Sequence, residues 1–256
     1  MAPLRGGRDA SILWLGVAVL GWGGVVGSGA AGPAGGVVAA LGLAFALRPE
    51  LPWPDRVMGL FVVAGGLLTA FAWPPIWPLA QLVMLAPAFL GARLSSALAP
   101  ARRGLALGRL QLGPVVVLAV SAAVGLLAWW QLTGPDLAAA RAMVPDWPLL
   151  AMVPAALGFS IVNAVLEEVA FRGLLQEALT AHFGEGWLPP LLSGIAFGLC
   201  HYHGFPSGTA GAVLAGGWGT LLGFARRRSG GLLTPVCGHV VADLVIFAIL
   251  AWLPSP

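Results

Sequence analysis

The sequence predicts an all-α protein, a polytopic transmembrane helical bundle with about 8–9 membrane spans. Two observations support this fold class. Hydrophobic residues make up 59% of the 256 residues and charged residues only 9%, whereas soluble domains usually contain about 25% charged residues. The 37 glycines and 21 prolines would weaken soluble helices, but both are commoner in membrane helices, where small residues allow close packing.

Apolar segments follow one another along the chain, most of them close to the roughly 20 residues that a helix needs to cross a bilayer. Many tryptophans fall near the ends of these segments, as expected at a membrane interface. The first segment mimics a signal peptide, but we expect a retained anchor because another apolar segment follows at once. Two segments are short, so the sequence leaves eight spans or nine open. The predicted spans are 11–29, 33–47, 57–73, 76–92, 113–130, 148–179, 188–203, 207–225 and 231–252.

The placement of the arginines predicts the topology, since all thirteen basic residues are arginines. With nine spans and a cytoplasmic N-terminus, twelve of the thirteen fall on the cytoplasmic side, and Arg141 is the exception. Arg172 is counted there as a residue at a helix end. The bias follows the positive-inside rule, so we expect a multi-pass protein of a bacterial inner membrane with its N-terminus in the cytoplasm. The net charge of +3 then reflects topology, and no nucleic acid is expected as a partner.

The chain divides at the segment 93–112, the one sizeable cytoplasmic linker. Residues 1–112 are expected to form N-terminal transmembrane helices, and the sequence gives them no role. Residues 113–256 are expected to form a core that carries the chemistry, because the polar residues inside apolar segments lie there.

Two adjacent carboxylates, Glu167 and Glu168, interrupt an apolar helix together with Arg172. An ionisable group at membrane depth costs several kcal/mol, so it rarely occurs without a partner and a purpose. Glu168 and Arg172 are four residues apart on one helix face, which predicts an ion pair. Glu167 lies about 100° further round the helix and keeps a free carboxylate. An ion pair that only packs helices is the alternative, which two histidines in the same half of the chain make less favourable.

Those histidines are predicted to lie at the depth of Glu167. Glu167 and His201 are at similar distances from the turn at 184–187, so the two arms of this hairpin bring them to one level. His239 and Asp243 are four residues apart on one face of the last helix. Each histidine alone can be a core residue bonded to a carbonyl, but together they can meet the carboxylate in one bundle. Histidine is the usual proton shuttle near neutral pH, and a carboxylate in reach of water can act as a general base.

Three motifs then resemble a known family. The segments EEVAFRG (167–173), FGLCH (197–201) and HVVAD (239–243) match, in order, the patterns E-E-x-x-x-R, F-x-x-x-H and H-x-x-x-N/D. These are motifs of the CPBP family of intramembrane proteases. The family includes CAAX prenyl endopeptidases of the Ras-converting type and bacterial relatives of the bacteriocin-processing, ABI type. The resemblance covers about residues 150–250.

The resemblance implies a glutamate-type intramembrane endopeptidase. It implies that Glu167, aided by His201, activates the attacking water, and that His239 and Asp243 bind the developing oxyanion. A carboxylate cannot stabilise an oxyanion unless it is protonated, so Asp243 is expected to orient His239 or to donate as a neutral acid. The eukaryotic members have asparagine at that place. Three further residues are expected to support the site structurally: Glu168, Arg172 and Phe197.

The expected substrate is a membrane-embedded or membrane-anchored protein or peptide, with the lipid bilayer as the surrounding partner. A C-terminal sorting tail or a peptide precursor is expected ahead of a CAAX-like tail. Two other functions stay open: a transporter or proton-relay protein, because such proteins also use intramembrane acids and histidines, and a non-catalytic immunity-type scaffold.

No cofactor is expected, and zinc is the alternative. The second half of the chain has enough ligand types for a three-ligand zinc site, but no His-Glu-x-x-His motif. On straight helices, Cys200 points about 100° away from His201, and Cys237 about 200° away from His239. His203 is expected to cap a loop near the substrate entrance.

Overall fold

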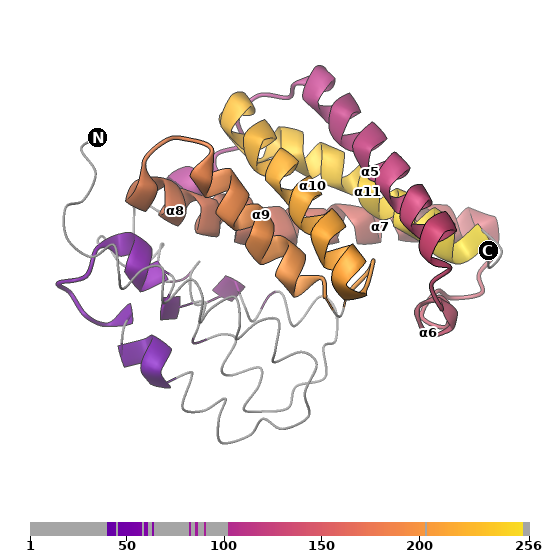
Figure 1. Ribbon diagram of the computed structural model, residues 1–256, viewed down its shortest axis with the longest axis horizontal. Coiled ribbons are helices and arrows are strands. Elements are labelled where there is room, and N and C mark those ends of the chain that lie inside the picture. The colour runs from indigo at the N-terminus through magenta and orange to yellow at the C-terminus, as the bar shows by residue number, and fades with distance from the viewer. Residues whose placement is uncertain are drawn as a thin grey trace.

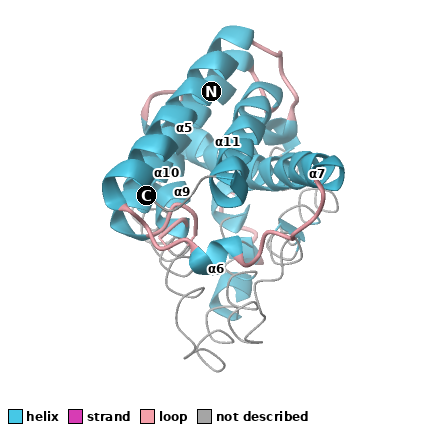
Figure 2. Ribbon diagram, turned by 90° about the vertical axis from the view of Figure 1, so that its right-hand side faces the viewer, coloured by secondary structure: helices cyan, strands magenta, loops and turns pink. Residues whose placement is uncertain are grey.

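The computed structural model describes residues 102–202 and 204–252, with residues 40–44, 46–57, 59, 60, 63, 82, 85, 86 and 90. These residues are helical with connecting loops, and no strand occurs among them (Figure 2). The predicted all-α class is therefore confirmed. The predicted spans before residue 102 fall wholly or largely outside the described residues, and so does His203.

Seven α-helices and one π-helical segment make up the described second half of the chain (Figure 1). Three helical stretches are long and apolar enough to cross a membrane: Leu112–Thr133, Leu149–Phe183 and Leu233–Trp252. The count of eight or nine spans is not confirmed, because α9 is a shorter apolar helix and α10 is rich in glycine and ends in three arginines. The elements are α5 (Leu112–Thr133), α6 (Ala138–Arg141), α7 (Leu149–Glu168), η2 (Val169–Leu175), α8 (Gln176–Phe183), α9 (Leu188–Cys200), α10 (Gly208–Ser229) and α11 (Leu233–Trp252).

The helical run from α7 through η2 to α8 is continuous over 35 residues. Its middle part, η2, is a π-helix of seven residues, a feature that often marks functional sites. Arg172 lies inside this part and is 0% exposed. The topology count, which placed Arg172 at a cytoplasmic helix end, was therefore wrong for this residue. The physical reason is that a carboxylate one turn away allows the guanidinium to be buried.

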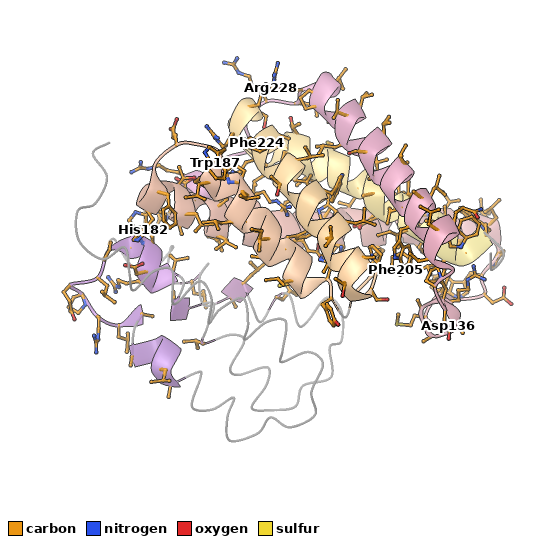
Figure 3. The ribbon with its side chains drawn as sticks, in the orientation of Figure 1. Asp136, His182, Trp187, Phe205, Phe224 and Arg228 are labelled. Atoms are coloured by element: carbon orange, nitrogen blue, oxygen red, sulfur yellow. The ribbon has the colours of Figure 1, made fainter. Side chains whose placement is uncertain are left out.

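Two glycines with positive φ mark the turns between the long helices. Gly184 (φ 79°) follows α8, and Gly230 (φ 72°) lies between α10 and α11; glycine adopts this backbone region without steric cost. Figure 3 shows Arg228, at the end of α10, and Asp136, in the loop before α6, at opposite ends of the bundle.

The helices α9 and α10 run side by side with their backbones in contact (Figure 1). A Cβ atom on Gly198 would lie 2.3 Å from the carbonyl oxygen of Ala212 and 2.7 Å from Cα of Gly216. A Cβ atom on Gly194 would lie 2.1 Å from the hydroxyl oxygen of Thr220. Small residues allow this approach, as in other membrane helix pairs.

The segment 106–111 pairs with the start of α11. The amides of Leu232 and Leu233 donate to the carbonyls of Ala106 and Leu107, at 2.9 and 2.8 Å. The first N–H groups of a helix have no partner within the helix. The segment before α5 therefore caps α11 with backbone carbonyls.

Candidate active site

The ion pair between Glu168 and Arg172 is present and is fully buried. Nη1 of Arg172 donates to Oε1 of Glu168 at 2.9 Å, and both side chains are 0% exposed. Nη2 donates to the carbonyl of Gly219 in α10 at 2.9 Å, and the guanidinium lies 4.5 Å from the ring centroid of Phe197 in α9. The expected pair is confirmed. It holds η2 against both α9 and α10.

His239 of α11 lies between the carboxylates of three residues. Its Nδ1 is 2.8 Å from Oε1 of Glu168, and its Nε2 is 3.5 Å from Oε2 of Glu167 and 3.7 Å from Oδ1 of Asp243. Glu168 is paired with Arg172 and can only accept, so Nδ1 carries a hydrogen and donates. This contact fixes the ring and leaves Nε2 facing the other two carboxyl groups.

The net negative charge of this cluster favours the binding of additional protons. Glu167, Glu168 and Asp243 carry three negative charges when ionised and Arg172 one positive charge, so the formal sum with neutral His239 is about −2. Uncompensated charge is costly in an apolar bundle. One proton on His239 and one on Glu167 or Asp243 would make the cluster neutral. The arrangement thus suits groups that hold and exchange protons around Nε2 of His239.

His201 occupies the end of α9, next to Phe197. Its Nδ1 lies 2.8 Å from the carbonyl oxygen of Phe197, which can only accept, so Nδ1 donates and the neutral ring keeps a lone pair on Nε2. The ring centroid of Phe197 is 4.2 Å from that of His201 and 5.8 Å from that of His239. Phe197 therefore contacts both imidazoles. The predicted approach of Glu167 to His201 within the reach of one water stays a prediction.

Two residues of this region had no role in the prediction. Nδ2 of Asn163, in α7, donates to Oδ2 of Asp243 at 3.2 Å. The ring of Trp218, in α10, lies 5.2 Å from that of His239 in a T-shaped contact, and its Nε1 donates to the carbonyl of Leu118 at 3.1 Å. Asn163 could have been found, because it lies one turn before Glu167 in an apolar helix. Trp218 could not, because it is one of eleven tryptophans.

The two cysteines are free thiols outside this cluster of contacts. Cys200 and Cys237 are each half-buried. Within residues 102–202 and 204–252, and the described pieces before them, no group of three His, Cys, Asp or Glu side chains is placed to hold a metal ion. Independence of metal stays a prediction.

The fold and the site define an integral membrane protein whose apolar helices enclose carboxylates, imidazoles and a guanidinium. Residues 147–245 match the family model described as Type II CAAX prenyl endopeptidase Rce1-like. Over this segment, the match confirms the resemblance to CAAX-type proteases. It reaches from just before α7 into α11 and includes every predicted site residue. No curated protein and no solved structure matches the chain.

Proposed function

We propose that this chain is an intramembrane endopeptidase of the glutamate type that cleaves a membrane-anchored protein or peptide. The observation that supports it best is the 3.5 Å approach of Glu167 Oε2 to His239 Nε2 inside the segment that matches the protease family. The side chains of these two residues are 18% and 4% exposed. This contact places the proposed base next to the proposed oxyanion donor, so that both can reach one scissile carbonyl group.

In the proposed reaction, Glu167 takes a proton from a water molecule as the water oxygen adds to the scissile carbonyl. His201 orients this water through its unprotonated Nε2. The tetrahedral oxyanion receives hydrogen bonds from Nε2–H of His239 and from Asp243 in its neutral form. The C–N bond then breaks, and the proton held by Glu167 passes to the leaving amine. The products are a carboxylic acid and a free amine, so no co-reactant other than water is needed.

The proposed substrate class is a lipid-anchored protein with a CAAX-like C-terminal tail. The description of the matching family, a CAAX prenyl endopeptidase, supports this class ahead of sorting tails and peptide precursors. The catalytic core is proposed to lie within residues 113–256, with the N-terminus of the chain and the arginine-bearing ends of the helices on the cytoplasmic side. The placement of Arg228 and Asp136 at opposite ends of the bundle fits the proposal that these two loops lie on opposite sides of the membrane (Figure 3).

Two other functions predict different behaviour. A proton-relay protein could use the same buried acids without hydrolysing a peptide bond. A non-catalytic scaffold could keep the fold, and replacing Glu167 would then leave its function unchanged. The match to a family of proteases favours hydrolysis over both.

The test is Glu167→Gln in the full chain, purified and placed in liposomes. The probe is an internally quenched peptide with a farnesylated CAAX tail, compared with the same peptide without the farnesyl group. We expect Glu167→Gln to lower the cleavage rate by about 10²- to 10⁴-fold, the usual contribution of a general base, while the protein still accumulates in the membrane. Asp136→Asn, in the exposed loop before α6, is the matched control and should cleave like the wild type. Wild-type cleavage by Glu167→Gln would overturn the proposal.

A further inference from the structure

We propose that Asn163 is a positioning residue of the site, and that its side-chain amide sets the orientation of the Asp243 carboxyl group. This inference rests on the proposed function. It concerns a residue outside the three motifs that carried the resemblance.

The contact joins two helices that are far apart in the sequence. Asn163 lies in α7 and Asp243 in α11, 80 residues later, and both side chains are buried. Nδ2 of Asn163 donates to Oδ2 of Asp243 at 3.2 Å. Asn163 is also one helical turn before Glu167, so the amide lies on the same side of α7 as the proposed base.

The amide of Asn163 is unusual at this place, because it interrupts an apolar helix. Between Leu149 and Leu166, only Ser160 and Asn163 have polar side chains. A buried amide without hydrogen bonds is unfavourable. The hydrogen bond to Asp243 satisfies one donor of the buried amide, and it orients the amide toward the site.

The direction of the bond decides which oxygen of Asp243 faces the imidazole. Oδ2 accepts from Asn163, so Oδ1 is the oxygen left on the side of His239, where it lies 3.7 Å from Nε2. Without the amide, the carboxyl group could rotate about its Cβ–Cγ bond, because that torsion is broad and roughly two-fold. Asn163 also hydrogen-bonds the side chain of Glu167, so it acts on the reaction through these carboxyl groups, chiefly that of Asp243, and not by touching the substrate.

A double-mutant cycle tests this role. The variants are Asn163→Leu, Asp243→Ala and the two combined, each as the full chain in liposomes with the farnesylated CAAX peptide as the probe. Leucine branches at Cγ as asparagine does, although it is larger, and it cannot hydrogen-bond. We expect Asn163→Leu to lower kcat by about 10- to 100-fold, the loss of a hydrogen bond to an ionised or strongly polar group, with KM little changed. In the Asp243→Ala background, Asn163→Leu should have a clearly smaller effect, because only the hydrogen bond of the amide to Glu167 is then left to lose.

A purely structural amide would give different results. In that case the reductions in kcat caused by the two single changes would multiply in the double variant. The unfolding midpoint of Asn163→Leu would fall, and kcat and KM would not respond differently. Either additivity or a wild-type kcat for Asn163→Leu would overturn the role of Asn163. If Asn163→Leu does not accumulate, Asn163→Ala gives the same cycle, because alanine is well tolerated in helices.

The outcome for Asn163 can be separated from that for the proposed function. Hydrolysis that survives Glu167→Gln would remove the proposed function itself. Loss of hydrolysis in Glu167→Gln, together with a multiplicative cycle, would remove only the positioning role of Asn163.

Discussion

Replacing Arg172 by alanine should destabilise the bundle strongly. Arg172 makes three contacts that the change removes: the ion pair with Glu168, the hydrogen bond to the carbonyl of Gly219, and the cation–π contact with Phe197. All lie in the interior, since Arg172 and Glu168 are 0% exposed. The main effect is therefore a stranded charge on Glu168.

The magnitude follows from the geometry. At the 2.9 Å separation of Nη1 and Oε1, the Coulomb attraction at an effective dielectric constant near 20 is about 6 kcal/mol. Part of it is recovered, because Glu168 still accepts from Nδ1 of His239 at 2.8 Å. Breaking one side of a buried pair typically costs about 3–5 kcal/mol, and we expect the free energy of unfolding to fall by that amount. A typical total is about 5–15 kcal/mol, so the level of protein in the membrane should fall as well.

The assay is reversible unfolding in mixed micelles, with membrane accumulation measured alongside. Arg226→Ala is the matched control, because Arg226 also forms an ion pair, with Glu177 at 2.7 Å, but these side chains are 10% and 18% exposed. It should lose less stability than Arg172→Ala. The double variant Glu168→Gln/Arg172→Met removes both buried charges and should recover most of the loss, as replacement of buried ion pairs by neutral groups often does.

Two results would refute this reasoning. Arg172→Ala could unfold at the same denaturant concentration as Arg226→Ala, in which case the buried charge is not stranded. It could also accumulate normally and be inactive, in which case the arginine belongs to the catalytic or substrate-binding machinery.

Two further predictions concern helix packing and metal. Gly198→Ala should destabilise the protein by about 1–3 kcal/mol, because the new methyl would lie 2.3 Å from the carbonyl oxygen of Ala212. Gly217→Ala is the control and should not destabilise it, since a Cβ atom there has nothing within 4 Å. Equal unfolding midpoints of the two variants would contradict the tight contact of α9 and α10. Peptide cleavage should persist in EDTA and phenanthroline, because the proposed reaction uses Glu167 as the base; activity lost to chelator and restored by zinc would contradict this.

The parts of the site that were predictable from sequence are local. The pairing of Glu168 with Arg172 follows from their spacing of four residues within one helix. The turns at Gly184 and Gly230 follow from the flexibility of glycine between apolar segments. Each of these needs only the geometry of one helix or one turn.

The parts that were not predictable depend on how helices rotate against one another. His239 meets Glu168, 71 residues earlier, and no local pattern indicates which carboxylate its Nδ1 will face. The π-helix Val169–Leu175 adds to this difficulty, because its wider turns change the angular relation between residues before and after Glu168.

The pairing of the segment 106–111 with the start of α11 determines where the chain can be truncated. A recombinant fragment that began at residue 113, where hydropathy alone would place its boundary, would lack the carbonyls of Ala106 and Leu107. The amides of Leu232 and Leu233 would then lose their acceptors, and the first turn of α11 would fray. His239 lies less than two turns further along this helix. A fragment that is to keep the first turn of α11 should therefore begin before residue 106, within the linker rather than after it.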